Sequence, residues 1–337
     1  MHLENLSEYY VKPRMLIVHD PTDFDAFQGF SLTADTKELL AKFLFRECPD
    51  IEQLHDQHRS FVKELRKHVE VTYLTEILGC SNLPLYKNYF KNNPNHVYAH
   101  DALITVPWIP DGYILGNMKK AIRRDEPTVL AKVADLLGLR EIINIPSHLY
   151  LEGGDVIPFC YDDKRVFLMG YGPRTSKETL FFLRETLIRD GIVDEIIGFQ
   201  LAEWRLNIDG CFFPVSNSIA VSQPESILAG IRLGRDFTYK INPLEFFEQL
   251  GFIIIEATKE ESYFKQACNF VCLDTRSLAA YNITDRVNRI LRLKGLDIIG
   301  IAGDQLVKGN GGPHCMTRPI YGNSSSATGW LSSRNHP

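Results

Sequence analysis

The sequence predicts an α/β fold arranged as a five-bladed propeller with pseudo-fivefold symmetry. A unit of one helix followed by one strand recurs five times, with apolar residues first at helical spacing and then in a short β-rich run. The five units are FVKELRKH with VEVTYL, VLAKVADLLG with LREIINIP, TLFFLRETLIRDG with IVDEIIGFQ, LEFFEQL with GFIIIEA, and RVNRILRLKG with LDIIGIAG. Four junctions carry a glycine where a helix C-cap is expected. Radial repetition of such a unit is typical of a propeller.

Each strand is followed by a second apolar segment, which we expect to be a strand interrupted by a polar or reactive residue. These segments are HVYAHDALITV, SHLYLEGGDVIPF, LAEWRLNIDGCFFPV, SYFKQACNFVCLD and GNGGPHCMTRPI. The interrupting residues are Asp101, Glu152, Asn207 with Asp209, Asn269 and Cys315. Any one alone could be a turn residue at a strand end. Five at corresponding positions favour a shared polar centre around the propeller axis, because buried polar groups need partners.

The composition indicates a globular protein of one domain. The chain has 337 residues, of which 45% are hydrophobic and 23% charged, and no linker-like stretch separates its parts. We expect a single catalytic domain over residues 1–322 and a polar, flexible tail over 323–337. The formal net charge of −5 disfavours nucleic acid or an anionic membrane as a partner.

The cysteines and the apolar runs indicate a cytoplasmic protein. Seven scattered cysteines do not suggest a disulfide framework, so a reducing compartment is expected. No apolar run approaches the roughly 20 residues of a membrane helix, and the N-terminus has no apolar signal-peptide core. Cys268 and Cys272 lie in apolar surroundings without a matching Cys/His pair, so we interpret them as core residues rather than metal ligands.

Cys315 is the candidate nucleophile, and its surroundings suggest a cationic substrate. Glycines precede it and could let the backbone approach a ligand closely. Four carboxylates fall in the polar segments: Asp101, Glu152, Asp155 and Asp209. Carboxylates raise the pKa of a nearby thiol, which is unhelpful unless the substrate is a cation. A planar guanidinium fits, because carboxylates pair with it bidentately and its central carbon can then face the sulfur.

At these residues the sequence resembles the arginine deiminase and amidinotransferase superfamily of guanidine-modifying enzymes, which have the pentein fold. The resemblance covers roughly residues 8–322. It is carried by PNHVYAHDA, GNMKKAIRRDE, LEGGDVIPF, YGPRT and a nearly continuous match that ends in GGPHCMTRPI. It implies that Cys315 forms a covalent S-alkylthiouronium intermediate, that Asp101 and Asp209 hold the guanidinium nitrogens, and that Glu152 supports this grip or the proton relay. It also implies that Arg174, and Arg123 or Arg124, face the carboxylate end of the substrate.

Three features depart from the family pattern. Asn207 stands where the family has the histidine that acts as general acid/base, and an asparagine has no titratable proton. His314, His100 and His148 are conceivable substitutes; the first two are neighbours of site residues on expected strands and should point to the opposite face, so His148 is the preferred candidate. Asn310 occupies a substrate-binding position where deiminases have Arg. The helical subdomain that bacterial deiminases insert before PNHVYAHDA is absent.

The most favoured function is hydrolysis of arginine or an arginine-like guanidino compound through Cys315. Amidino transfer to an amine shares the first half-reaction and stays open. A guanidine-binding protein without chemistry, or a change engineered at Asn207, would also account for the missing histidine. We expect a small guanidino substrate, no cofactor and no metal ion; the oligomeric state is open.

Overall fold

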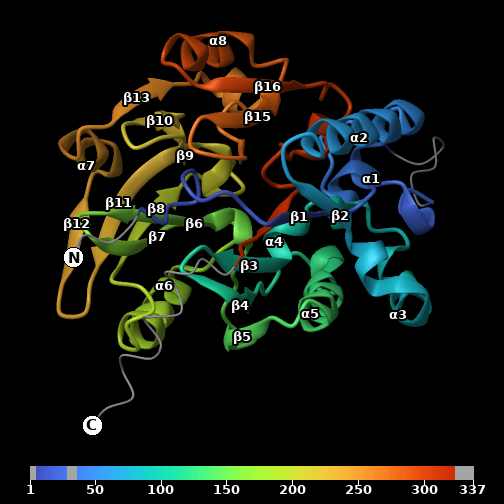
Figure 1. Ribbon diagram of the computed structural model, residues 1–337, viewed down its shortest axis with the longest axis horizontal. Coiled ribbons are helices and arrows are strands. Elements are labelled where there is room, and N and C mark those ends of the chain that lie inside the picture. The colour runs from blue at the N-terminus through green and yellow to red at the C-terminus, as the bar shows by residue number, and fades with distance from the viewer. Residues whose placement is uncertain (1–4, 29–35, 323–337) are drawn as a thin grey trace.

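Five sheets surround a common centre (Figure 1). The structure is a computed structural model that describes residues 5–28 and 36–322. In each sheet a first strand pairs antiparallel with a second, and the second pairs parallel with a third. In that order the sheets are β17 (Arg318–Ile320), β1 (Met15–Val18) and β2 (Glu70–Tyr73); β3 (Leu103–Val106), β4 (Ile109–Leu115) and β5 (Arg140–Ile143); β6 (Val156–Tyr161), β7 (Lys164–Tyr171) and β8 (Glu195–Leu201); β9 (Phe212–Pro214), β10 (Ile219–Ser222) and β13 (Ile253–Glu256); and β14 (Val271–Cys272), β15 (Ser277–Tyr281) and β16 (Asp297–Ile301).

A helix connects the two parallel strands of every sheet, as a parallel crossover requires. These helices are α2 (Ile51–Leu65), α5 (Glu126–Leu136), α6 (Lys177–Leu183) continued by the π-helix η5 (Arg184–Ile188), α7 (Pro243–Gln249) and α8 (Asp285–Leu293). All five predicted helix–strand units are therefore confirmed. Four glycines end these helices with positive φ angles, at Gly138 (71°), Gly191 (68°), Gly251 (86°) and Gly295 (90°), which is the left-handed conformation of a helix C-cap.

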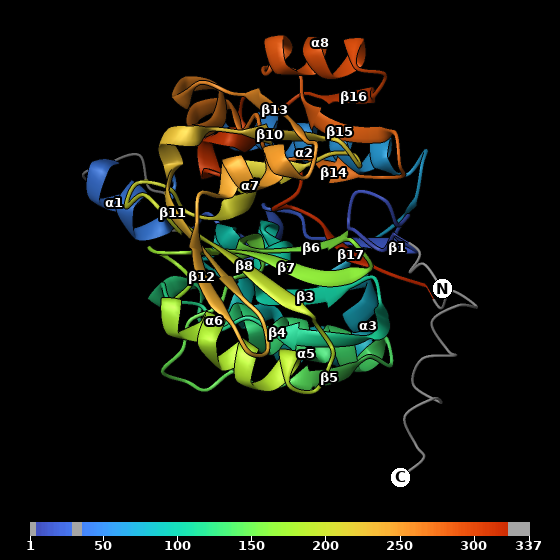
Figure 2. The same ribbon diagram turned by 90° about the vertical axis from the view of Figure 1, so that its left-hand side faces the viewer.

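Three elements lie outside the fivefold pattern. The hairpin of β11 (Ile227–Leu233) and β12 (Thr238–Ile241) continues the sheet of β6, β7 and β8, because β11 pairs antiparallel with β8 (Figure 2). The helix α1 (Thr36–Phe43) precedes α2, and α3 (Leu74–Phe90) follows β2, with a kink at Gly79. Two short helical segments that meet at Gly79 thus fill the short segment before PNHVYAHDA.

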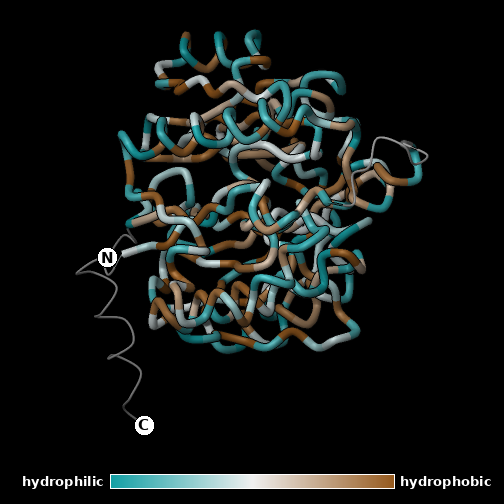
Figure 3. Tube along the Cα trace, turned by 90° about the vertical axis from the view of Figure 1, so that its right-hand side faces the viewer, coloured by the Kyte–Doolittle hydropathy of each residue, from teal (hydrophilic) through white to brown (hydrophobic). Residues whose placement is uncertain are grey.

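The two ends of the described chain share one sheet. Met15 of β1 pairs with Ile320 of β17, so the C-terminal strand completes the first blade and closes the ring. Figure 3 shows hydrophobic residues concentrated in the interior and alternating with hydrophilic ones on the outer helices. The predicted tail, 323–337, lies outside the described residues.

The hydrophobic core contains the two cysteines that the sequence placed there. Cys268 and Cys272 are buried in the same hydrophobic cluster as Phe159 and Phe247, which confirms them as core residues. Each fully buried phenylalanine contributes about 1.5–3 kcal/mol. All seven cysteines are free thiols. Within residues 5–28 and 36–322, we find no helix with the length and apolar character needed to cross a membrane.

Candidate active site

Cys315 lies at the centre of the propeller, in contact with polar residues from two other blades. Its Sγ lies 3.1 Å from Nδ2 of Asn269 and 3.3 Å from Oδ2 of Asp209. Its backbone N–H donates to Oδ1 of Asn269 at 3.3 Å. The Asn269 amide therefore fixes both the backbone and the sulfur of Cys315.

The remaining polar segments join the same network. The Asn207 side-chain amide donates to Oδ2 of Asp155 at 3.0 Å and lies 3.4 Å from Glu152. The backbone N–H of Gly154 donates to Oδ1 of Asp101 at 2.9 Å. The five segments thus meet at one polar centre.

The expectation that these residues interrupt strands is wrong. Each lies in or next to a turn just before the first strand of its sheet. Asp101 lies in the helical turn α4 (Ala99–Ala102), Glu152 precedes the 3₁₀ turn η4 (Gly153–Asp155), Asp209 lies in η6 (Ile208–Gly210), Asn269 follows the π-helix η8 (Glu260–Phe264), and Cys315 follows η9 (Leu306–Gly309). In such turns side chains do not alternate between opposite faces as they do in a strand. Neighbours in sequence can therefore both reach the centre.

The glycines before Cys315 make room for protein side chains. A Cβ atom on Gly311 would lie 2.2 Å from the ring of Tyr98, and one on Gly312 would lie 2.4 Å from Oδ1 of Asn269. The close approach predicted for a ligand is thus made by the side chains that hold the turn.

Cys315 is a protonated thiol in the resting site. Burial, together with the charges of Asp209 and Asp101, raises the pKa of the thiol well above its usual range. The sulfur lies at the junction of two hollows of about 310 Å³ each, which share Leu206, Asn207 and Asn310. A bound cation would offset the two carboxylates and make the thiolate accessible.

His314 is an imidazolium beside the nucleophile. Its Nδ1 donates to Oδ2 of Asp209 at 2.9 Å, and its Nε2 donates to Glu8 at 2.8 Å. Burial opposes this charge, but Glu8 and Asp209 outweigh it and raise the pKa of His314 to about 9. The objection that His314 and Cys315 should face opposite ways does not hold, because residues 313–316 form a turn. Both side chains contact the same oxygen of Asp209.

Arg123 is enclosed by carboxylates. Its Nη1 lies 2.7 Å from Oδ2 of Asp101, and its Nε and Nη2 bind both oxygens of Glu126 at 2.7–3.1 Å. Burial raises the pKa of Glu126 to about 7 even though Arg123 opposes this shift. The charge of Arg123 is already compensated, so it braces Asp101.

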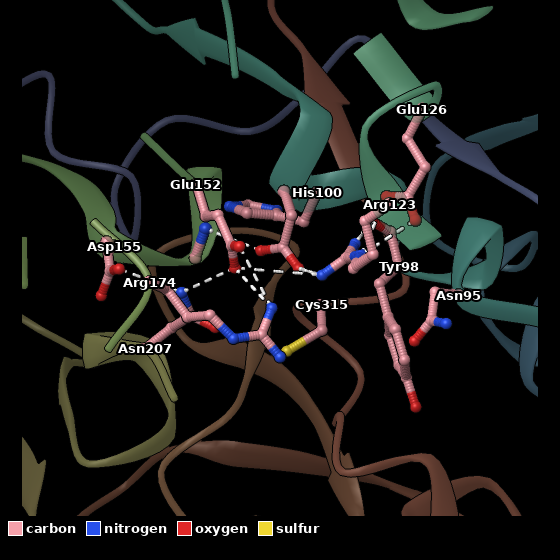
Figure 4. A network of polar contacts seen from close by, with 12 residues as sticks. Asn95, Tyr98, His100, Arg123, Glu126, Glu152, Asp155, Arg174, Asn207 and Cys315 are labelled. Carbon is pink, nitrogen blue, oxygen red and sulfur yellow. Dashed lines mark hydrogen bonds and ion pairs between the residues drawn. The ribbon is translucent and has the colours of Figure 1, made fainter. Parts of the chain in front are cut away.

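Arg174 occupies the space beside Glu152 in the same hollow as Cys315 (Figure 4). Its Nη1 binds both oxygens of the fully buried Glu152 at 3.0–3.1 Å. On the far side of Glu152, burial raises the pKa of Asp155 to about 8, so this carboxyl is mostly protonated at neutral pH. The charge of Arg174 is thus paired with Glu152.

Asn310 and the two other substitute histidines have different positions. Asn310 lines both hollows, and its amide donates to the carbonyl of Leu44 at 3.0 Å. His148 is exposed in a turn, so the preference for it is not supported. His100 is buried, donates Nδ1 to the carbonyl of Thr317 at 2.7 Å, and packs against the His314 ring.

Arg124 does not reach the site. It is exposed in the turn before α5, whereas its neighbour Arg123 is buried. Consecutive residues of this turn, η3 (Ala121–Arg123) and its C-cap, point in different directions. Of the two arginines that were candidates for facing the substrate, only Arg123 therefore lies in the site.

Three groups of the site were not anticipated from the sequence. Glu8 pairs with His314 across 306 residues of sequence. Glu126 stands three residues after Arg123, a spacing that could have indicated the pair. Arg205 lines the second hollow together with Cys315. Its position two residues before Asn207 was the available signal.

One trio in the described part of the chain has donor atoms close enough to hold a metal ion. The ligand atoms of Glu8, His100 and His314 lie within 4.8 Å of one another. However, both ring nitrogens of His314 donate to carboxylates, so neither offers a lone pair to a metal. The buried guanidinium of Arg318, which donates to the carbonyl of His100, adds a second positive charge here. We interpret the trio as a charge network.

Comparison with known proteins identifies the family. A family model described as arginine deiminase matches residues 80–230 and 240–322. The chain belongs to the arginine deiminase family. An arginine deiminase of Staphylococcus aureus strain MRSA252 is 21% identical over 304 residues, covering 80% of this chain and 71% of the relative. The family confirms the predicted class, a guanidino-modifying enzyme.

Solved structures of members of the arginine deiminase superfamily share the fold. AgrE in a ternary complex with ornithine and NAD⁺ matches with a TM-score of 0.68 and 15% identity over 92% of this chain. This chain spans 39% of AgrE. The N-terminal domain of ArgZ, a cyanobacterial arginine dihydrolase, matches with a TM-score of 0.66 and 14% identity, covering 91% of this chain and 98% of that domain. A dimethylarginine dimethylaminohydrolase matches with a TM-score of 0.62 and 18% identity over 91% and 99%. The predicted pentein fold is confirmed.

Proposed function

We propose that the protein hydrolyses the guanidinium group of arginine or an arginine-like compound through a covalent thiouronium on Cys315. The observation that carries this proposal is the position of the Cys315 sulfur, 3.3 Å from Asp209 and in one hollow with Asp101. A thiol buried among carboxylates suits a substrate that is a cation and an electrophile at once.

The substrate itself supplies the charge that activates the nucleophile. Without a ligand, burial and the charges of Asp209 and Asp101 raise the pKa of the Cys315 thiol and keep it protonated. A guanidinium between these carboxylates pairs with their charges and lowers the thiol pKa. Ionisation of Cys315 is then coupled to binding, which limits side reactions of the thiol.

The proposed steps conserve atoms and charge. The sulfur bonds to the guanidinium carbon while the thiol proton passes to Asp209. The C–N bond of the leaving nitrogen then breaks as that nitrogen takes up a proton, which releases ammonia and leaves the thiouronium. Water adds to the same carbon, the C–S bond breaks, and the thiol recovers a proton. The sum is guanidinium plus water giving a ureido product and ammonium.

Proton transfer in these steps is assigned to Asp209 and His314. Asn207 can hydrogen-bond but cannot carry a proton. Asp209 touches both the thiol and the imidazolium, so His314 can return a proton through Oδ2 of Asp209. Asp209 is thus the catalytic residue for proton transfer beside the nucleophile Cys315, and His314 acts through it as a positioning and proton-supplying residue.

The test is intact-protein mass spectrometry after incubation with arginine, combined with assays for ammonia, citrulline, ornithine and urea. A mass increase that is absent in Cys315→Ser, together with ammonia and citrulline, supports the proposal. An adduct that is released only when an amine acceptor is added indicates amidino transfer. No adduct and no product with arginine, agmatine, methylated arginines and guanidinoacetate would overturn it in favour of a binding protein.

We also infer that residues 1–322 act as one catalytic unit, because side chains of the site come from all five blades. The free thiols of all seven cysteines support a reducing cytoplasm as the compartment. The proposed steps need only the substrate and water.

A further inference from the structure

The two hollows that meet at Cys315 differ in how their cations are compensated. In the hollow that contains Asp101, Arg123 binds Asp101 and Glu126, and Arg174 binds Glu152. Neither of these arginines has a free charge to offer an anion. The second hollow is lined by Arg205, Asp209, Gly210, Tyr263 and Gln266, as well as by residues shared with the first. Its one carboxylate, Asp209, is bound by His314, so the charge of Arg205 is the one left for an anion.

Arg205 is a buried cation without a carboxylate partner. Arg205 is 3% exposed, and no Asp or Glu oxygen of the described residues lies within 4.0 Å of its guanidinium. Its Nε donates to Oγ of Ser226 at 3.0 Å and its Nη2 to Oγ of Ser262 at 2.7 Å, both neutral groups. Burying an unpaired charge costs several kcal/mol, at least about 3. A site that keeps such a charge is suited to an anionic ligand.

The surroundings hold the Arg205 guanidinium rigidly. The Ser262 hydroxyl donates to the carbonyl of Gly210 at 2.7 Å, and the Ser226 hydroxyl donates to Gln223, so both oxygens are oriented to accept from Arg205. The guanidinium also lies over the ring of Trp204, 5.1 Å from its centroid. These contacts preorganise it.

Arg205 is also tied to the turn that carries Asp209. A Cβ atom on Gly210 would lie 2.9 Å from Nη1 of Arg205, so the glycine permits this approach. Nη1 is the nitrogen with no partner assigned among the described residues. It sits beside η6 in the same hollow as the Cys315 sulfur. A substrate held by its guanidinium at Cys315 can therefore place its other end along this hollow.

We propose that Arg205 binds the carboxylate of the substrate and is therefore the residue that selects a guanidino acid over a guanidino amine. This inference rests on the proposed function, because it assumes that the guanidinium carbon sits at Cys315. The exposed ammonium of Lys259, 4.2 Å from the Trp204 ring centroid, adds positive charge at the outer side. Together they attract a guanidino acid and disfavour a guanidino amine.

The experiment compares arginine with agmatine, which has the same guanidinium and chain but no carboxylate. Dissociation constants are measured by calorimetry in Cys315→Ser, and KM and kcat in the active enzyme, each with and without Arg205→Met. We expect Arg205→Met to raise the dissociation constant of arginine about 10- to 100-fold, which is the usual effect of losing a hydrogen bond to a charged group. Agmatine should change little, and kcat for arginine should fall much less than KM rises. The matched control is Arg124→Met, at an exposed arginine outside the site, which should alter neither ligand.

The results distinguish a carboxylate-binding role of Arg205 from a purely structural one. Equal losses for both ligands would assign Arg205 a structural role and overturn the inference. If Arg205→Met does not fold, the comparison within Cys315→Ser alone still decides, because agmatine binding as tightly as arginine would overturn it. Absence of binding and of turnover for both ligands would instead contradict the proposed function.

Discussion

Oδ2 of Asp209 lies 2.9 Å from Nδ1 of His314 and 3.3 Å from Sγ of Cys315, so one oxygen joins an imidazolium to the proposed nucleophile. This arrangement offers a route for protons in a site where Asn207 replaces the expected acid/base. The first two predictions follow from it.

His314→Gln should lower kcat for arginine by about 10²- to 10⁴-fold, the usual effect of losing a general acid or base. The glutamine retains hydrogen-bonding capacity but supplies no proton, so KM should change far less than kcat. Steady-state assays of ammonia and citrulline measure both. His148→Gln, at an exposed turn, is the control and should leave both constants unchanged. A kcat in His314→Gln equal to that of the parent protein would exclude the route through Asp209.

The stability of the protein should fall as the pH rises towards 9. The pKa of His314 is raised to about 9 in the folded state, from an ordinary value of 6.5. The protonated imidazole therefore contributes on the order of 3 kcal/mol to the free energy of unfolding. This contribution is fully present below pH 6.5 and is lost as the pH passes 9. Urea unfolding at a series of pH values measures this loss.

The same measurement on His314→Gln provides the control. The groups that face His314 are Glu8, Asp209, His100, Arg318 and Cys315. Because these groups remain, a pH dependence due to them should persist in the variant. If the variant loses stability between pH 6.5 and 9 as steeply as the parent protein, the imidazolium is not its source.

Glu152→Gln should destabilise the protein by about 3–5 kcal/mol, because it leaves Arg174 buried without its counter-ion. Adding Arg174→Met should recover part of this loss, since the double variant leaves no unpaired charge at this ion pair. Urea unfolding of the two single variants and the double variant gives the coupling. Asp285→Asn, which removes an exposed partner of Arg289, is the control and should cost less than about 1 kcal/mol. If the losses of the two single variants add up to the loss of the double variant, the ion pair contributes no coupling energy and the prediction is wrong.

Local sequence patterns were sufficient to predict the blades. Each helix–strand unit combines a helical period with a short apolar run, and four of the five add a glycine with positive φ. All of these signals act within about 25 residues. The convergence of Asp101, Glu152, Asp209, Asn269 and Cys315 followed from their equivalent places after five strands. The hairpin of β11 and β12 breaks this repeat and was not anticipated.

The directions and partners of the side chains could not be predicted in the same way. Whether Arg123 or Arg124 turns inward depends on Asp101 and Glu126, which the fold brings to one side. The role of His314 depends on Glu8, which comes from the opposite end of the chain. Treating the Cys315 segment as a strand directed attention to His148, because strand alternation would turn His314 away.

Asp209→Asn should lower the pKa of the Cys315 thiol while reducing turnover. The charge of Asp209 is the larger of the two carboxylate contributions that hold this thiol protonated, after burial itself. Removing that charge favours the thiolate, and it also leaves the His314 imidazolium with less compensation, which acts in the same direction. The variant nevertheless loses a ligand for the guanidinium and the proposed proton route. The thiolate is followed by its ultraviolet absorbance during a pH titration, with Cys315→Ser subtracted to remove the other cysteines. A thiol pKa that stays the same or rises would mean that the Asp209 charge does not reach the sulfur, so that burial and Asp101 alone keep the thiol protonated.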